Sequence, residues 1–134
     1  MTVVLIDTSI WIDYLSLRPG TAAARLDELV ASNTPFALTP IILEEILQGA
    51  RSSHEFQRLR KNLLSQRFLF ALDAIESYAS AAEIYLRCRR AGVTPRSTID
   101  CLIAQIAMEN GAALLHNDAD FDRIATVVPD LMIL

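Results

Sequence analysis

The sequence is poor in basic residues, and lysine is nearly absent from it. Twelve Lys and Arg stand against sixteen Asp and Glu in 134 residues, and Lys61 is the only lysine. The resulting net charge of −4 does not match the basic surface that is typical of nucleic-acid binders. Taken alone, the overall charge argues against such a function, so any functional interpretation has to account for it.

Long apolar runs and paired cysteines are also missing. The longest charge-free stretch, 29–43, contains two prolines and an asparagine, so no transmembrane helix is expected. The N-terminus has neither the basic nor the uninterrupted apolar segment of a secretory signal. Cys88 and Cys101 lack metal-binding spacing, and we expect both to be reduced and buried in a cytoplasmic protein.

What the chain does contain is enough apolar material for one core. Apolar residues make up 52% and charged residues 21%, which excludes a disordered chain. The length is that of one typical domain, and neither a repeat nor a long linker divides it. We therefore expect a single domain over residues 1–134.

Short apolar runs alternate with helical patterns along the chain. Strands are expected at 2–6, 36–39, 67–72, 113–116 and 131–134. Helices are expected at 9–17, 21–31, 41–50, 53–66, 74–91 and 98–110, with a break at Pro19-Gly20 and a short last helix after Asp120. Continuous apolar strands between helices predict a three-layer α/β/α sandwich with a central, mostly parallel sheet of four to five short strands.

Carboxylates follow several of the expected strands. In a parallel sheet, ligands bind beyond the carboxyl ends of the strands. Asp7 follows the first strand, Glu45 lies on the helix after the second, Asp100 opens a helix, and Asp118 and Asp120 follow the fourth strand. With no lysine nearby, we expect these acids to converge without a cationic neighbour and to repel each other. A hard divalent cation, Mg²⁺ or Mn²⁺, makes such an arrangement favourable.

Each acid also has a purely structural explanation. A lone Asp7 after a strand suits a turn or a helix N-cap, and the later aspartates suit helix starts. Glu44 and Glu45 lie about 100° apart around their helix, and the apolar neighbours favour Glu45 as the inward one. The convergence of four acidic segments at one end of a sheet is less easily explained by capping.

Four short motifs carry these acids. They are V-L-I-D-T-S at 4–9, E-E-I-L-Q-G at 44–49, T-I-D-C-L-I-A at 98–104 and L-L-H-N-D-A-D-F at 114–121. In order and spacing they resemble the four acidic motifs of PIN-domain ribonucleases, and the compact length resembles the VapC toxins of bacterial toxin–antitoxin pairs. The sequence departs from the family pattern at His116, where a threonine is usual.

The resemblance implies an Mg²⁺-dependent endoribonuclease, with Mn²⁺ as an alternative metal, in a PIN-like fold. Asp7 and Asp100 match the acids that bind the metal directly. Glu45 matches an acid that binds it through water or helps to activate the attacking water. Asp118 and Asp120 both fit the fourth acidic position, and Asp118 is favoured.

The resemblance also implies supporting residues and partners. Ser9 matches a hydroxyl that supports the site, and Asn117 matches a polar residue near the phosphate. Family members are commonly homodimers and bind a small antitoxin protein whose segment fills the active groove. The expected protein is thus a cytoplasmic homodimer with an RNA substrate and no membrane contact.

Other interpretations are weaker on the residues. A receiver-type phosphorylation domain needs a lysine after its last strands and an acidic pair after the first, and both are missing. A dehalogenase-like phosphatase needs D-x-D where this chain has D-T-S, and a binding module that had lost activity would lack one of the acids. A PIN-like nuclease that is not a toxin stays an alternative. Trp11 and Tyr14 are expected in the core or a subunit interface, His54 in solvent, and His116 in structural hydrogen bonds.

The acidic balance itself divides along the chain. Residues 51–96 contain nine Lys and Arg and four Asp and Glu, a net charge of +5. The rest of the chain contains three Lys and Arg and twelve Asp and Glu, a net charge of −9. Part of the negative charge is the expected metal site, and bound Mg²⁺ would cancel some of it. Some basic residues of the middle segment are candidates for contact with an RNA backbone, although a solvated helix face is the commoner explanation for such charges. The basic residues of this segment include Arg51, Arg58, Arg60, Lys61 and Arg67.

Overall fold

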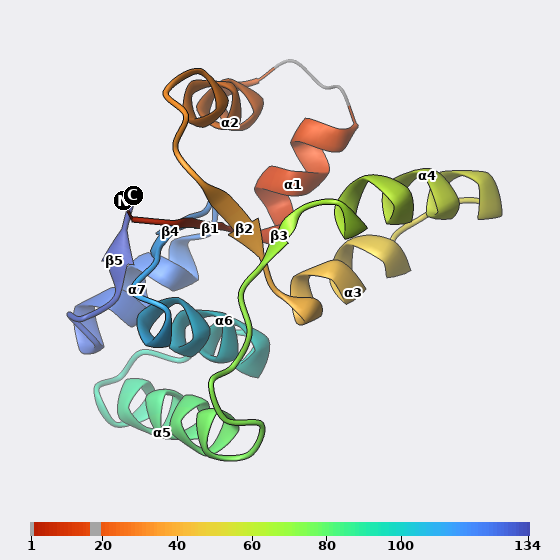
Figure 1. Cartoon of the computed structure of the whole chain (residues 1–134). Coiled ribbons are helices and arrows are strands. Elements are labelled where there is room, and N and C mark those ends of the chain that lie inside the picture. The colour runs from red at the N-terminus through yellow and green to blue at the C-terminus, as the bar shows by residue number, and fades with distance from the viewer. Residues whose placement is uncertain (1, 17–19) are drawn as a thin grey trace.

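Strands and helices alternate through a computed structural model that describes residues 2–16 and 20–134 (Figure 1). The strands are β1 (Val4–Ile6), β2 (Phe36–Leu38), β3 (Arg67–Phe68), β4 (Ala113–Leu115) and β5 (Met132–Ile133). The helices are α1 (Thr8–Leu15), α2 (Thr21–Ala31), α3 (Pro40–Gln48), α4 (Ser53–Leu64), α5 (Glu76–Arg90), α6 (Thr98–Glu109) and α7 (Ala119–Val127). The predicted helix end at Leu17 and the predicted break at Pro19 lie outside the described residues.

The five strands form one parallel sheet in the order β3-β2-β1-β4-β5. In the register of the sheet, Val4 of β1 lies between Phe36 of β2 and Ala113 of β4. Helices α1 and α2 lie on one side of the sheet and α5 and α6 on the other (Figure 1). The three-layer α/β/α prediction is thus confirmed. Since every pair is parallel, all five strands end at the same edge.

The core lies on both faces of the central strands. β1 and β4 are buried along their whole length, because continuous apolar strands are covered by helices on each side. Trp11 is 1% exposed and packs against Phe36 with ring centroids 5.9 Å apart, which confirms the predicted core packing. Cys88 and Cys101 are free and buried, as expected.

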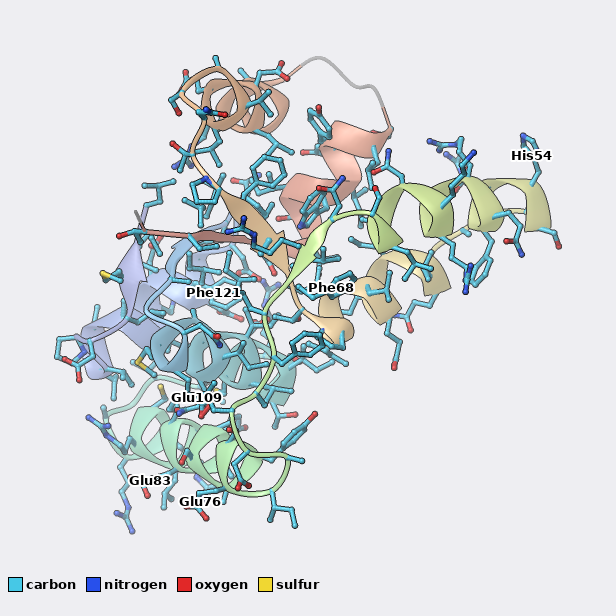
Figure 2. All side chains as sticks on the ribbon, viewed as in Figure 1. His54, Phe68, Glu76, Glu83, Glu109 and Phe121 are labelled. Atoms are coloured by element: carbon cyan, nitrogen blue, oxygen red, sulfur yellow. The ribbon has the colours of Figure 1, made fainter. Side chains whose placement is uncertain are left out.

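Two element boundaries differ from the prediction. The apolar run 67–72 pairs with the sheet only at Arg67 and Phe68. Beyond this edge strand the chain is drawn toward α6, where the backbone N–H of Leu72 and the hydroxyl of Ser77 donate to Glu109 (Figure 2). The last helix begins at Ala119, so Asp120 lies inside it instead of before it.

None of the helices in the described ranges is both long and apolar enough to cross a bilayer. His54 projects from the start of α4 into solvent, as the sequence predicts (Figure 2).

Candidate active site

An open cavity of about 420 Å³ lies at the carboxyl edge of the sheet. Its wall is formed by residues that follow β1 and β4, by the first turns of α1 and α6, and by the second turn of α3, because parallel strands deliver their following residues to one edge. Six of the seven predicted site residues line it. They are Asp7, Ser9, Glu45, Asp100, Asn117 and Asp118.

Asp7 lies at the centre of this edge. Its backbone N–H donates to the carbonyl of Leu115 at 2.9 Å, which fixes the end of β1 beside the end of β4. Asp7 occupies the N-cap position of α1, but its side chain makes no capping hydrogen bond and instead accepts from the Ser9 hydroxyl at 3.5 Å. The capping explanation therefore does not account for this buried carboxylate, which is 7% exposed.

Glu45 points into the cavity from α3, as its apolar neighbours predict, whereas Glu44 is exposed. The helix begins with Pro40, and the buried N-cap Thr39 accepts the backbone N–H of Ile42 at 3.2 Å. The hydroxyl of Thr8 donates to Glu45 Oε1 at 2.8 Å. Thr8 is not among the predicted site residues, although its position directly after Asp7 could have indicated it.

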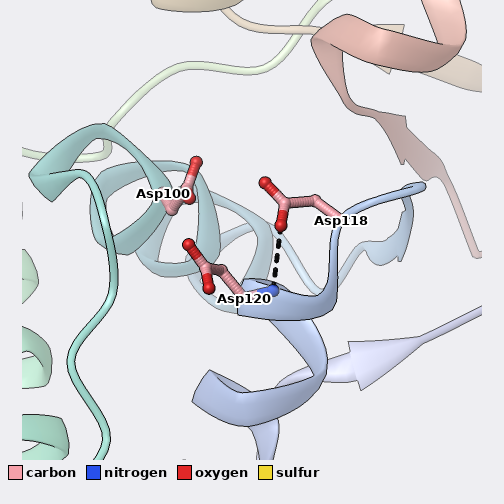
Figure 3. Close-up of side chains that lie close together, drawn as sticks. All are labelled: Asp100, Asp118 and Asp120. Carbon is pink, nitrogen blue, oxygen red and sulfur yellow. Dashed lines mark hydrogen bonds between the residues drawn. The ribbon is translucent and has the colours of Figure 1, made fainter.

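Asp100 stands in the first turn of α6, whose N-cap Ser97 accepts the backbone N–H of Ile99. Oxygen atoms of Asp100, Asp118 and Asp120 all lie within 4.8 Å of one another, and Figure 3 shows the three carboxylates facing a common point.

The two acids at the head of α7 have different surroundings. Asp118 is the N-cap and accepts the backbone N–H of Asp120 at 2.9 Å (Figure 3). Asp120 is 1% exposed, and both of its oxygens are bound by guanidinium groups. Oδ2 accepts from Arg96 Nε at 3.1 Å, and Oδ1 accepts from Arg123 Nη1 at 2.7 Å.

The expectation of acids without a cationic neighbour is therefore wrong. Arg96 bridges Asp120 and Asp118, its Nη2 donating to Asp118 Oδ1 at 3.1 Å. The prediction considered only lysine, and Arg96 stands far from Asp120 in the sequence. Burial alone would raise the pKa of Asp120, but the hydrogen bonds from Arg96 and Arg123 outweigh it and hold the pKa below its ordinary value.

His116 has the structural role that the sequence predicts. Its Nδ1 accepts the backbone N–H of Asp118 at 3.0 Å, so Nε2 carries the proton that it donates to Asp122 at 3.1 Å. The ring also packs on Phe121, with centroids 5.2 Å apart. The histidine thus fixes the turn that places Asp118, and Asn117 between them is exposed at the cavity.

The ionised form is disfavoured in two of the converging acids. Burial raises the pKa of Asp7 to about 6, and the charges of Glu45 and Asp118 add to the rise. Burial raises the pKa of Asp100 to about 7, followed by the charges of Asp118 and Asp7. Mutual repulsion of this kind is relieved by a bound cation.

The donor set fits a hard divalent cation. It consists of carboxylate oxygens from separate elements, without a thiolate or an imidazole aimed at the cavity among the described lining residues. The acids that line the cavity and offer oxygens are Asp7, Glu45, Asp100 and Asp118. The arrangement has the chemistry of a centre that binds a metal and the phosphate oxygens of a substrate.

Comparison with known proteins agrees with this chemistry. The family model of the PIN domain matches residues 4–127. The chain is 39% identical over 125 residues to Ribonuclease VapC11 of Mycobacterium tuberculosis H37Rv and to VapC ribonuclease Mb1587 of Mycobacterium bovis, covering 92% of each chain. The chain therefore belongs to the PIN-domain family, whose ribonucleases depend on a metal ion, and within it to the VapC ribonucleases. This membership excludes the receiver and dehalogenase alternatives.

The fold is shared with solved toxin–antitoxin structures. The VapBC2 structure from Rickettsia felis, bound to a promoter DNA fragment, aligns with a TM-score of 0.77 at 22% identity, covering 99% of this chain and 98% of that one. VapBC-1 from nontypeable Haemophilus influenzae aligns with a TM-score of 0.70 at 21% identity, covering 99% and 97%. At sequence identities of 21–22%, these comparisons establish a shared fold.

Proposed function

We propose that this VapC ribonuclease, acting as a single PIN domain, hydrolyses RNA phosphodiester bonds at the acidic cavity. Asp7, Asp100 and Asp118 hold Mg²⁺, with Mn²⁺ as a substitute, and Glu45 acts on the attacking water. The observation that carries the proposal is the convergence of carboxylates from four segments in one open cavity, two of them with strongly raised pKa values.

Each acid has a distinct task in this proposal. The metal supplies charge neutralisation and water activation when bound. Thr8 fixes Oε1 of Glu45, which leaves Oε2 to accept a proton from the water that attacks phosphorus. Asp118 serves as the fourth acid, since Asp120 has both oxygens committed to arginines. Ser9 supports Asp7, and Asn117 at the rim donates to the phosphate.

We further propose that a small antitoxin segment occupies the groove beside the cavity. This groove has a volume of about 550 Å³ and shares Ile12 with the acidic cavity. Its apolar lining suits an amphipathic segment, and Arg58 suits an acidic side chain of that segment, whereas Arg51 pairs with Glu55 of the same groove. An occupant would extend over the acids and shield them. In this proposal, both the antitoxin and the RNA substrate are cytoplasmic.

The test is cleavage of total bacterial RNA with Mg²⁺, with and without EDTA. Asp7→Ala and Asp100→Ala should each lower cleavage at least about 100-fold, because several kcal/mol of charge stabilisation are lost. Asp27→Ala, at an exposed acid on α2, is the matched control and should cleave like the wild type. Expression should arrest growth, and a co-expressed antitoxin should relieve the arrest.

If Asp7→Ala and Asp100→Ala both cleave RNA as fast as the wild type, the proposed site is wrong. Growth without arrest, combined with Mg²⁺-dependent cleavage in vitro, would favour a PIN nuclease that is not a toxin.

A further inference from the structure

One cation stands at the mouth of the acidic cavity. Among the described residues that line the cavity, Arg96 is the only positively charged one. It lies in the segment between α5 and α6, directly before the N-cap of α6, and its side chain is 78% exposed. An arginine so exposed gains little from simple ion pairing in water, so its position calls for a further explanation.

The guanidinium is held in place from the protein side. Asp120 Oδ2 accepts both the backbone N–H of Arg96 at 3.2 Å and its Nε at 3.1 Å. Arg123 binds the other oxygen of Asp120 and makes no hydrogen bond to Arg96. Two points of attachment fix the direction in which the Arg96 guanidinium faces, and thereby reduce the entropy lost when it binds a ligand.

The outer edge of the guanidinium is available to a ligand. Nη2 donates one N–H to Asp118 Oδ1. Within the part of the chain whose side chains are described, the other three N–H groups, one on Nη2 and two on Nη1, make no hydrogen bond. Paired guanidinium N–H groups match the spacing of two phosphate oxygens. They also lie next to Asp118, a proposed ligand of the metal.

We propose that Arg96 binds the phosphodiester that is cleaved and supplies a second positive charge to it beside the metal. The inference rests on the proposed ribonuclease function and deepens it. Asp118 contacts Arg96 and also belongs to the carboxylate cluster that would hold the metal, so a phosphate bound there would lie beside the guanidinium. Asp120 is then a positioning residue that acts through Arg96, which explains why a fully buried carboxylate lies beside the cavity without lining it.

The alternative is that Arg96 serves only to hold the acids of α7 in place. Arg96→Met removes the guanidinium, and Arg96→Lys keeps the charge. Arg123→Met is the matched control, since it removes the other ion pair of Asp120 without changing the lining of the cavity. Mn²⁺ affinity is measured by calorimetry without RNA. Affinity for a short fluorescein-labelled single-stranded RNA of mixed sequence is measured with Ca²⁺ at several KCl concentrations.

A phosphate contact predicts a specific pattern. Arg96→Met should reduce the slope of log affinity against log salt by about 0.7, the value for one lost phosphate contact to a single strand. Arg96→Lys and Arg123→Met should keep the slope, and all variants should keep Mn²⁺ affinity. With Mg²⁺, Arg96→Met should lower the cleavage rate about 10²- to 10³-fold, as for loss of one fixed donor at a developing charge.

An unchanged slope in Arg96→Met, or a loss of Mn²⁺ affinity in that variant, would overturn the inference and leave Arg96 a structural role. Failure of the proposed function gives a different result. In that case the wild type would not cleave RNA at all, while the salt slopes would still report whether Arg96 contacts a phosphate.

Discussion

At the scale of the residue, the buried carboxyl group of Asp7 lowers the stability of the folded protein when it is ionised. Its pKa is raised to about 6, so the folded state binds a proton more tightly than the unfolded chain does. Without metal, the free energy of unfolding therefore falls as pH rises from about 4 through 6, and it stays low above that range. The ionised carboxylate of Asp7 lowers stability but is the form that would bind the proposed metal ion.

Replacing this charge should stabilise the metal-free protein. Each unit of pKa shift corresponds to about 1.4 kcal/mol, so Asp7→Asn should raise the free energy of unfolding by roughly 1–3 kcal/mol near pH 8. The gain should vanish below about pH 4, where Asp7 is protonated. Urea unfolding in EDTA at both pH values measures it, with Asp27→Asn as the control at an exposed acid.

Added Mg²⁺ should reverse the order near pH 8, because it stabilises only the folded protein that binds it. A wild type that is more stable than Asp7→Asn in EDTA near pH 8 would contradict the proposed repulsion.

At the scale of the element, helix caps fix the helices that carry the acids, and α3 is the clearest case. Thr39 follows β2, is fully buried, and caps the helix that carries Glu45. Thr39→Ala should lower the free energy of unfolding by about 1 kcal/mol, the usual loss for a cap. It should also slow RNA cleavage, because the start of the helix that carries Glu45 is loosened.

Ser52→Ala is the matched control for that variant. Ser52 caps α4 by accepting the backbone N–H of Glu55 at 3.0 Å, and it is exposed and outside the cavity. A similar loss of stability with unchanged cleavage is expected, as measured by urea unfolding and RNA cleavage. Equal cleavage by the two variants would contradict a role for the cap of α3 in the site.

The elements also show what the sequence can and cannot predict. Strand ends and helix starts are local patterns, so the placement of Asp7, Glu45 and Asp100 in one cavity follows from alternation of strands and helices alone. The ion pairs of Arg96 are different, because they depend on how the segment before α6 packs against α7. No local pattern encodes that contact. The early end of β3 likewise depends on Glu109, which lies far along the chain.

At the scale of the whole molecule, an apolar face lies on α5 and the segment before it. Phe70, Leu72, Ile75 and Tyr78 are all more than half exposed. The adjoining groove of about 310 Å³ has no charged residue among those that line it, its floor including Ile41 and Leu102. This uncharged groove can meet a copy of itself without like-charge repulsion within its lining, so we propose that it forms the expected homodimer.

Charge on this face should separate the subunits. Tyr78→Glu should shift the molar mass in light scattering from that of a dimer to that of a monomer, because the interface would bury two like charges. Val30→Glu is the control, since Val30 is 54% exposed and Tyr78 is 55% exposed, and Val30 lies on α2 away from this groove. A monomeric wild type, or a dimer that survives Tyr78→Glu, would contradict the proposal.

The order of the sheet has a consequence for synthesis of the chain. β4 pairs with β1 in parallel, and the turn that follows β4 brings Asp118 to Asp7, two residues separated by most of the sequence. A growing chain that has not yet passed residue 118 lacks one wall of the acidic cavity. During synthesis the complete acidic cavity therefore cannot form until the segment that carries Asp118 has been translated.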